Sequence, residues 1–333
     1  MRIIFFGASE LGWLCCRTLF EIEQDVVGIF SIPQQFRISW SSGNVTNVRF
    51  KSFEDLASEY SIPLIYVTKK MSDPEYREVV QTLHPDLLVV IGWYYMIPRS
   101  LRELAPLGAV GVHASLLPKY RGGAPLVWAI INGETSTGIS LFHFADGVDD
   151  GDIIGQDSFE IMETDEITDV VAKSTIAAKN LVRRYIPLLA KGEAPRLSQD
   201  HSQATYVPQR KPEDGLIDWS SLSAKATYNW IRAQTKPYPG AFTYLAGQKV
   251  TIWRARLCES AISSGTDHPG TLYISKNREG YQVLVSCADG KYLELVEMQI
   301  SNNNDESSID VIEFLARRWH PNQPRNQWVF SSH

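Results

Sequence analysis

The stretch His113–Pro125, which reads HASLLPKYRGGAP, constrains the fold of this chain more than any other. It follows the apolar run Leu87–Ile91, which is typical of a buried strand. His113 is therefore expected where a strand of the sheet gives way to a loop. Two prolines and two glycines inside the stretch exclude a regular element there, so the loop should follow a fixed, irregular path.

A second polar loop follows soon after. Gly138–Phe144 alternates as a strand does, and Gly147–Asp152 then reads GVDDGD, a loop with three carboxylates. Taken alone, the histidine is most often structural and the acidic run a solvated turn. A calcium loop is set aside because Val148 stands where such loops need an oxygen ligand. Together, the two loops are expected at the edge where open α/β sheets bind ligands.

Alternating strand and helix patterns predict the α/β class. Residues 2–32 read strand, glycine turn, helix and strand, and the alternation predicts a Rossmann-like, mostly parallel sheet with helices on both faces. Five short strand patterns after residue 241 predict a small OB-like β-barrel. The expected division is a Rossmann-like domain at 1–190, a linker at 191–205, the OB-like domain at 206–300 and a C-terminal extension of unassigned role at 301–333.

Several motifs together resemble the folate-dependent formyltransferases. They are His113–Gly122, Asn132–Glu134, Val148–Ile153, Arg210–Trp219 and Lys236–Tyr244. That family includes methionyl-tRNA formyltransferase, the formyltransferases of nucleotide-linked amino sugars and the hydrolase part of formyltetrahydrofolate dehydrogenase. The resemblance implies an N-formyltransferase that uses 10-formyltetrahydrofolate as co-substrate. The two C-terminal motifs look most like the formyltransferase that acts on UDP-4-amino-4-deoxy-L-arabinose.

The composition argues against several other classes of protein. A net charge of −6 provides no global attraction to nucleic acid. No apolar run approaches the ~20 residues that span a bilayer, and the chain starts directly in a strand pattern, so we expect a cytoplasmic protein without a signal peptide or membrane contact. Its four cysteines lack metal-ligand spacing, which predicts reduced core thiols and no metal site.

The turn Gly7–Gly12 is close to a dinucleotide-binding fingerprint, but Ser9 replaces the middle glycine that lets a pyrophosphate approach. The strand after it also ends without the acidic residue that holds a ribose, so we do not expect nicotinamide binding. A helix N-terminus can still receive an anion. Ser9 and Glu10 are therefore expected either to face a ligand or to form an ordinary turn. Residues 34–48 are polar and poorly periodic, and we expect a loop there.

His113 is the candidate general acid/base. Moving a formyl group to a primary amine requires that the amine lose a proton and that the folate nitrogen leave protonated. An imidazole with a pKa near ~6.5 can take and return that proton at neutral pH. The family pattern assigns to Asp149 the carboxylate that fixes the tautomer and stabilises the imidazolium.

Gly111 departs from the family pattern. Most members carry Asn two residues before the histidine, where its amide N–H stabilises the oxyanion, and one such donor is typically worth about 100- to 1,000-fold in rate. Three explanations stay open: protonated His113 acts alone, another donor substitutes, or the enzyme is weak or repurposed. If a donor is missing, Gly111→Asn should raise kcat.

The resemblance also implies where folate and substrate bind. In the family, the loop after the strand Leu87–Ile91 holds the pterin largely by backbone hydrogen bonds, although its aromatic rings could instead pack in the core. The residues expected to bind folate are Ile91, Trp93, Tyr94, Tyr95, Met96, Ile97, Leu116, Asp146 and Gly147. Those expected to bind the amine substrate are Ser9, Glu10, Ser115, Leu117, Lys119, Tyr120, Arg121 and Arg210.

The preferred substrate is a nucleotide-linked amino sugar, as used in lipopolysaccharide biosynthesis. The acidic charge supports it, as does the single basic residue, Arg37, in a region where tRNA-acting members carry a basic insertion. A tRNA enzyme would need a basic stripe, seen only in fragments at Arg254, Arg256, Arg317 and Arg318. A formyltetrahydrofolate hydrolase and a non-enzymatic binding module are further alternatives. We expect no nucleic acid partner, and a homodimer is left open.

Overall fold

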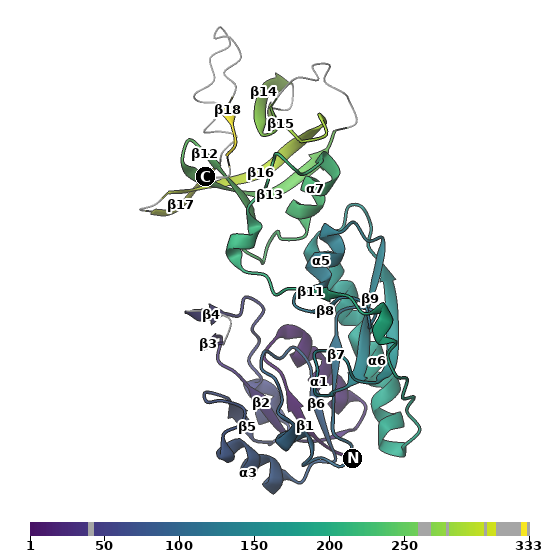
Figure 1. Cartoon of the computed structure of the whole chain (residues 1–333). Helices are drawn as coiled ribbons and strands as arrows, with labels where there is room; N and C mark the ends of the chain where they lie inside the picture. Colours follow the sequence, from purple (N-terminus) through teal and green to yellow (C-terminus); the bar gives the residue numbers. More distant parts are fainter. Residues whose placement is uncertain (39–42, 259–267, 278–279, 303–304, 311–327, 332–333) are drawn as a thin grey trace. The chain divides into compact units, whose positions relative to one another are not determined.

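The computed structural model describes residues 1–38, 43–258, 268–277, 280–302, 305–310 and 328–331 (Figure 1). The chain divides into two compact units. The N-terminal unit comprises residues 1–125, 136–160 and 171–208, and the C-terminal unit comprises residues 126–135, 161–170 and 209–333. Every helix in the described part of the chain is too short or too polar to cross a membrane.

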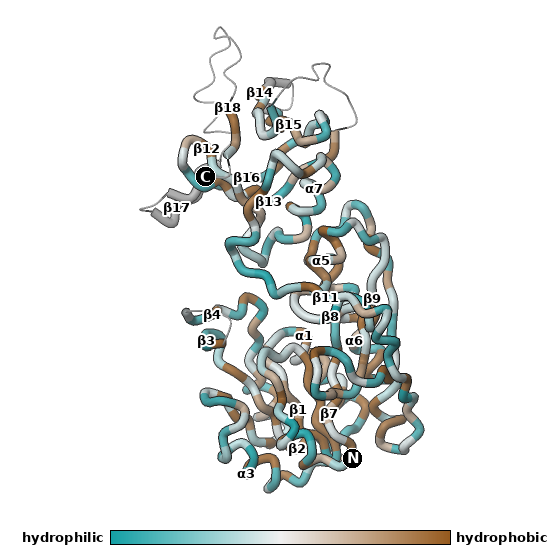
Figure 2. Tube along the Cα trace, viewed as in Figure 1, coloured by the Kyte–Doolittle hydropathy of each residue, from teal (hydrophilic) through white to brown (hydrophobic). Residues whose placement is uncertain are grey.

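The N-terminal unit is built on a mostly parallel sheet, which confirms the predicted fold class. Its strands within the described residues are β1 (Arg2–Phe6), β2 (Asp25–Ser31), β5 (Leu64–Tyr66), β6 (Leu87–Val90), β7 (Ala109–His113), β9 (Ser136–His143) and β10 (Ile153–Glu160). They lie in the order β10-β9-β7-β6-β1-β2-β5. The five strands from β7 to β5 run parallel, and β9 and β10 pair antiparallel. Figure 2 shows the hydrophobic character of β1 and β7.

Helices cover both faces of this sheet. They are α1 (Glu10–Glu21), α2 (Glu54–Glu59), α3 (Pro74–Leu83), α4 (Arg99–Arg102), α5 (Pro125–Ile131) and α6 (Ile167–Lys191). Because successive side chains of a strand point to opposite faces, Ile3 and Phe5 of β1 join one buried cluster with residues of α1 and α6, whereas Ile4 and Phe6 join another with residues of α3 and α4. Helix α5 and the start of α6 belong to the C-terminal unit.

The prediction of a loop at residues 34–48 is wrong in part. Strands β3 (Gln35–Arg37) and β4 (Asn44–Thr46) pair antiparallel within it. Phe36 of β3 is 6% exposed, and its ring lies 4.9 Å from that of Tyr94 and 5.8 Å from that of Tyr95. The pairing was missed because a single buried aromatic does not make a period-2 pattern.

The C-terminal unit contains an antiparallel sheet with the order β12-β13-β16-β15-β14-β18 among the described residues, and β17 pairs with β16. Each neighbouring pair is antiparallel, which confirms the predicted all-β domain. The strands are β12 (Ala241–Leu245), β13 (Gln248–Leu257), β14 (Thr271–Asn277), β15 (Gly280–Ser286), β16 (Tyr292–Asn302), β17 (Asp305–Asp310) and β18 (Trp328–Val329). Helix α7 (Ala224–Arg232), capped by the Ser223 hydroxyl, precedes them.

Residues 328–331 connect the two ends of this sheet. Thr271 of β14 pairs with Val329, and Tyr244 of β12 forms a bridge with Ser331. Between them, Phe330 is 3% exposed and stacks on Trp219 with 5.4 Å between ring centroids. Part of the extension for which the sequence indicated no role therefore curls the sheet toward a barrel and completes its core.

Phe330→Ala should destabilise the C-terminal unit by about 3–5 kcal/mol, because it removes a buried ring and leaves a cavity against Trp219. Val329, which is 47% exposed, provides the matched control, and Val329→Ala should change stability by no more than about 0.5 kcal/mol. Urea unfolding followed by tryptophan fluorescence measures both. Equal effects of the two substitutions would contradict the closing role of Phe330.

Candidate active site

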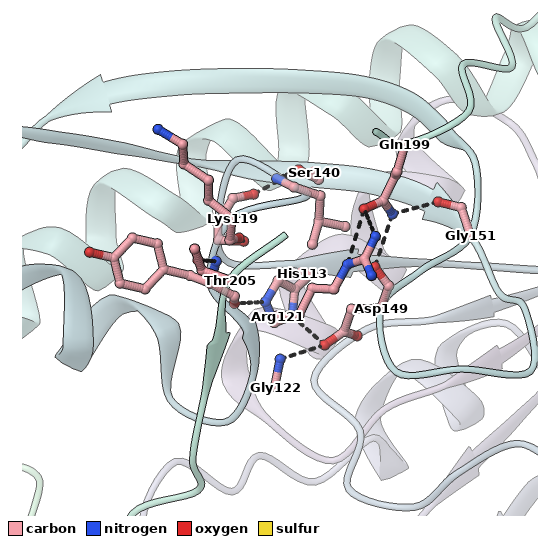
Figure 3. Close-up of polar contacts among 12 residues, drawn as sticks. His113, Lys119, Arg121, Gly122, Ser140, Asp149, Gly151, Gln199 and Thr205 are labelled. Atoms are coloured by element: carbon pink, nitrogen blue, oxygen red, sulfur yellow. Dashed lines mark hydrogen bonds and ion pairs between the residues drawn. The ribbon is translucent and has the colours of Figure 1, made fainter. Parts of the chain in front are cut away.

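His113 is the last residue of β7 and is 8% exposed. Its Nε2 lies 2.7 Å from the backbone carbonyl oxygen of Tyr120, farther along the same loop (Figure 3). Tyr120 has a left-handed φ of +57°, and its backbone N–H donates to Thr205 Oγ1 at 2.8 Å. The loop thus returns on itself and holds the imidazole ring from one side.

Asp149 holds the ring from the other side. Its Oδ2 lies 3.5 Å from His113 Nδ1 and also accepts a hydrogen bond from the backbone N–H of Gly122 at 2.9 Å. Asp149 itself has a left-handed φ of +52°, a strained backbone for an aspartate that turns the loop at this point. The structure therefore brings together the histidine and the carboxylate that the sequence analysis placed on separate loops.

The two contacts of His113 define different roles for its nitrogens. A carbonyl oxygen only accepts, so Nε2 must carry a hydrogen to bond Tyr120. Nδ1 then faces the Asp149 carboxylate. The Tyr120 carbonyl orients Nε2, and the role of Asp149 in fixing the tautomer stays a prediction.

Two predicted substrate residues, Ser115 and Leu117, lie inside the histidine loop. Both are buried. The Ser115 hydroxyl donates to the Lys119 carbonyl at 2.6 Å, and the Leu117 N–H donates to Ser140 Oγ at 3.0 Å. Gln156 Nε2 donates to the Leu117 carbonyl at 2.9 Å. These contacts shape the loop, whereas the Lys119 side chain is exposed at its surface.

Arg121 of β8 (Arg121–Gly122) is 1% exposed. Its guanidinium donates to Gln199 Oε1 and to the Tyr206 hydroxyl, and lies 3.1 Å from His201 Nδ1. Binding of the amine substrate by Arg121 stays a prediction, and the buried position of the side chain favours a role within the protein.

Arg210 belongs to the C-terminal unit, where it lies between two indole rings. Its guanidinium carbon is 4.8 Å from the Trp128 ring centroid and 4.9 Å from that of Trp230. It also donates to the Asp214 carbonyl and to Gln234 Oε1. Burial lowers the pKa of the Arg210 guanidinium. Substrate binding by Arg210 likewise stays a prediction.

Ser9 and Glu10 start α1. The buried Ser9 side chain accepts from the Gly12 N–H at 3.3 Å as the helix cap, and Glu10 pairs with Arg49 at 3.2 Å. Both contacts are those of an ordinary strand-to-helix turn, which was the alternative left open by the sequence.

The residues of the loop predicted to hold folate, Ile91 to Ile97, differ in how exposed their side chains are. Ile91 and Ile97 are buried, whereas Met96 is 67% exposed. Trp93, Tyr94 and Tyr95 are half-buried and contact one another or Phe6 and Phe36. The buried Nε1–H of Trp93 has no hydrogen-bond partner among the described residues. A ligand with an acceptor atom would satisfy it.

Three predicted folate residues remain. Leu116 lies on the histidine loop (residues 113–125), and Asp146 and Gly147 lie on the acidic loop (residues 144–152) between β9 and β10. Leu116 is half-buried, and its carbonyl accepts from the Lys119 N–H. Asp146 is exposed and pairs with Arg102 at 2.5 Å. Asp146 also borders a cavity of about 510 Å³ that Arg99, Glu103 and Phe144 help to line.

Gly111 has no room for a side chain. A Cβ there would lie 2.5 Å from Phe144 Cε1 and 2.6 Å from the backbone oxygen of Val90. The second distance cannot be relieved by rotating a side chain. Any side chain at position 111 would therefore require the Phe144 ring and strand β6 to shift, and the hypothesis that Gly111→Asn simply supplies a missing donor has to be corrected.

Sequence reasoning missed the residues that the segment 196–207 contributes. This segment was predicted to be mostly linker, yet β11 (Tyr206–Val207) pairs parallel with β8. Gln199 is 6% exposed and contacts the acidic loop, and Thr205 contacts the histidine loop. A lone glutamine in a polar stretch carries no sequence signal; only the extended pattern near Tyr206 could have indicated the pairing.

No group of three or more histidine, cysteine or carboxylate side chains that could hold a metal occurs among residues the structure describes. Cys15, Cys16 and Cys287 are buried, and burial raises the pKa of Cys15 to about 12. These cysteines pack in the core and present no thiolate.

The fold and the histidine–aspartate site define a known class of enzyme. The chain matches the family model for formyl transferase over residues 1–186 and the model for the formyl transferase C-terminal domain over residues 210–314. It therefore belongs to the formyl transferase family.

Relatives with similar sequences cover nearly the whole chain. A methionyl-tRNA formyltransferase of Desulforamulus reducens is 33% identical over 315 residues, covering 95% of this chain and 94% of the relative. One of Geobacter sulfurreducens is 32% identical over 316 residues, covering 95% and 93%.

Solved structures share the fold. WlaRD, a sugar 3N-formyl transferase crystallised with dTDP and 5-N-formyl-THF, has a TM-score of 0.62 at 16% identity over 92% of this chain and 98% of that one. The N-formyltransferase from Helicobacter canadensis with folinic acid and dTDP-3-aminofucose has a TM-score of 0.63 at 17% identity, over 88% of this chain and 98% of that one.

Gly111→Ala should destabilise the N-terminal unit by about 1–3 kcal/mol, because the new Cβ forces β7 away from the Val90 carbonyl of β6. Gly43 has open space around its Cβ position, so Gly43→Ala is the control and should change stability by at most about 0.5 kcal/mol. Urea denaturation measures both variants. A Gly111→Ala protein as stable as the wild type would show that the two strands separate freely.

Proposed function

We propose that this protein transfers a formyl group from 10-formyltetrahydrofolate to the primary amine of a nucleotide-linked amino sugar. The observation that carries the proposal is the position of His113 Nδ1 beside the Asp149 carboxylate, with Nε2 bonded to the Tyr120 carbonyl. A buried imidazole with one nitrogen left for proton exchange suits an amine that must lose a proton.

When bound, 10-formyltetrahydrofolate supplies an activated formyl group. His113 Nδ1 accepts the proton that the amine loses as its nitrogen bonds to the formyl carbon, and Asp149 stabilises the resulting imidazolium. His113 returns the proton to the departing folate nitrogen, so the products are a formamide and tetrahydrofolate. The half-buried aromatic loop fits a flat ring that carries hydrogen-bond acceptors, because its Trp93 N–H has no partner in the described part of the chain.

Four ion pairs of the C-terminal unit support a small substrate. Four cations of its described part each pair with a carboxylate: Lys225 with Glu163, Lys236 with Glu297, Arg254 with Glu166 and Arg256 with Glu294. Paired cations attract a nucleic acid backbone weakly, because binding would first have to displace the carboxylates. Two of the four paired cations, Arg254 and Arg256, belong to the fragments of a basic stripe noted in the sequence. The other two residues of that stripe, Arg317 and Arg318, lie outside the described residues.

Formylation of methionyl-tRNA is the second candidate function. Identities of 33% and 32% to methionyl-tRNA formyltransferases over nearly the whole chain favour it. The two candidates share the site chemistry and differ in the acceptor amine, so the acceptor has to be identified by experiment.

Release of tetrahydrofolate from 10-formyltetrahydrofolate discriminates the candidates when it is measured against a panel of acceptors. The proposal predicts turnover with a nucleotide-linked amino sugar and none with charged initiator tRNA. Turnover with tRNA alone would establish the second candidate, and release without any amine would identify a hydrolase. No release under any condition would indicate a binding protein and overturn the proposal.

His113→Asn should lower kcat by about 100- to 10,000-fold with little change in KM, because proton transfer is lost while binding contacts remain. Asp149→Asn should also lower kcat, since the imidazolium loses its carboxylate. The exposed His84 has a φ of +45°, which asparagine tolerates, so His84→Asn is the control and should be fully active. Steady-state kinetics with the accepted amine measure all three. Unchanged turnover in His113→Asn would exclude His113 as the acid/base.

A further inference from the structure

The side-chain amide of Gln199 is hydrogen-bonded to the backbone at Asp149. Its Nε2 donates to the Asp149 carbonyl at 2.9 Å and to the Gly151 carbonyl at 2.6 Å (Figure 3). Both hydrogens of the amide are thereby used, and both bind the acidic loop. The strained φ of Asp149 is thus fixed from the segment that follows α6.

Arg121 fixes the orientation of that amide. Its Nε and one terminal nitrogen both lie within hydrogen-bond distance of Gln199 Oε1, at 3.2 and 2.6 Å. A forked donor of this kind can only face the oxygen of the amide, so the NH₂ group must face the acidic loop. Gln199 therefore cannot flip without losing four hydrogen bonds.

The Arg121 guanidinium is buried among neutral groups. Within the described residues, it contacts Gln199, the Tyr206 hydroxyl and the His201 ring, and no carboxylate lies within ion-pair distance. An arginine that only filled space would be an expensive choice here, because burying a charge without an opposite charge is costly. Its five-donor fork is instead used to order three side chains of one segment.

The same short strand that carries Arg121 also contacts the carboxylate itself. Gly122, the next residue, donates its backbone N–H to Asp149 Oδ2. The residues just before Gln199 also contact the acidic loop and the strand that follows it. Arg196 pairs with Asp152 of the loop at 2.7 Å, and Leu197 exchanges two backbone hydrogen bonds with Ile153, the first residue of β10. The Arg196 guanidinium and the Ser198 hydroxyl lower the pKa of the Asp152 carboxyl.

We propose that Gln199, oriented by Arg121, is a positioning residue that sets the Asp149 carboxylate against His113 Nδ1. This proposal deepens the proposed function and rests on its proton-transfer step. Gln199 contacts Asp149 through the backbone only, and its effect on the reaction passes entirely through the placement of that carboxylate.

Gln199→Glu isolates the positioning contacts. A glutamate at position 199 still accepts from Arg121, but it has no hydrogen to donate to the two carbonyls of the acidic loop. We expect kcat to fall by about 10- to 100-fold, as for other displacements of a catalytic group, while KM stays within about threefold. The thermal unfolding temperature should be lower than that of the wild type, because two carbonyl oxygens lose their donor, and a cooperative transition shows that the variant still folds.

Gln203 provides the matched control. It is exposed, four residues farther along the same segment, in the short helix η1 (His201–Gln203). Gln203→Glu adds the same charge and should leave kcat unchanged. Equal kcat in Gln199→Glu and Gln203→Glu would overturn the proposal, as would a loss confined to KM.

A readout independent of substrate completes the test. Crystal structures of the wild type and of Gln199→Met, which has similar length and no charge, measure the distance from Asp149 Oδ2 to His113 Nδ1, which is 3.5 Å in the wild type. In Gln199→Met this distance should increase by about 1 Å or more, because the backbone that carries Asp149 loses both donated hydrogen bonds. An unchanged distance in a folded variant would refute the positioning role.

The two failures can be told apart. If the wild type releases no tetrahydrofolate with any acceptor, the proposed function fails, whereas the distance from Asp149 to His113 in Gln199→Met still decides whether Gln199 positions Asp149. If the wild type is active, Gln199→Glu keeps its full kcat and that distance is unchanged in Gln199→Met, only the positioning role fails. If Gln199→Met does not fold, the kcat of Gln199→Glu decides.

Discussion

The placement of one imidazole between two oxygen acceptors is the constraint on which this site depends. His113 faces the Tyr120 carbonyl with one nitrogen and the Asp149 carboxylate with the other. Neither acceptor sits in regular structure, since both Tyr120 and Asp149 have left-handed φ values. Such backbone persists only when the surroundings hold it, and here the segment 199–207 does so by contacting both loops.

Local patterns were enough to predict the sheet and the two loops. The run Leu87–Ile91 and the alternation of Gly138–Phe144 report burial directly, so β6 and β9 followed from composition and period. The positions of His113 and Asp149 at strand ends followed from the same patterns. Their 3.5 Å approach, the pairing of β3 with β4 and the role of Gln199 depend on contacts between distant residues.

Gly111 shows most clearly why a motif cannot be interpreted without its packing. Read in sequence, glycine in place of asparagine is a missing donor that a substitution could restore. In the fold, the Phe144 ring and the Val90 carbonyl already occupy the space beside its Cα. The departure at 111 and the aromatic at 144 are therefore one feature of the sheet, since β7 and the end of β9 lie side by side.

The enclosed position at 111 also limits how an oxyanion can be stabilised. With no side-chain donor at that position, stabilisation has to come from a backbone N–H, from another side chain or from charge. In the proposed reaction the His113 imidazolium supplies charge, with its two nitrogens facing the Tyr120 carbonyl and the Asp149 carboxylate. In the proposed reaction, this imidazolium forms as the amine proton arrives, at the moment when negative charge develops on the formyl oxygen. A site that works in this way does not need the asparagine that the family pattern places at position 111.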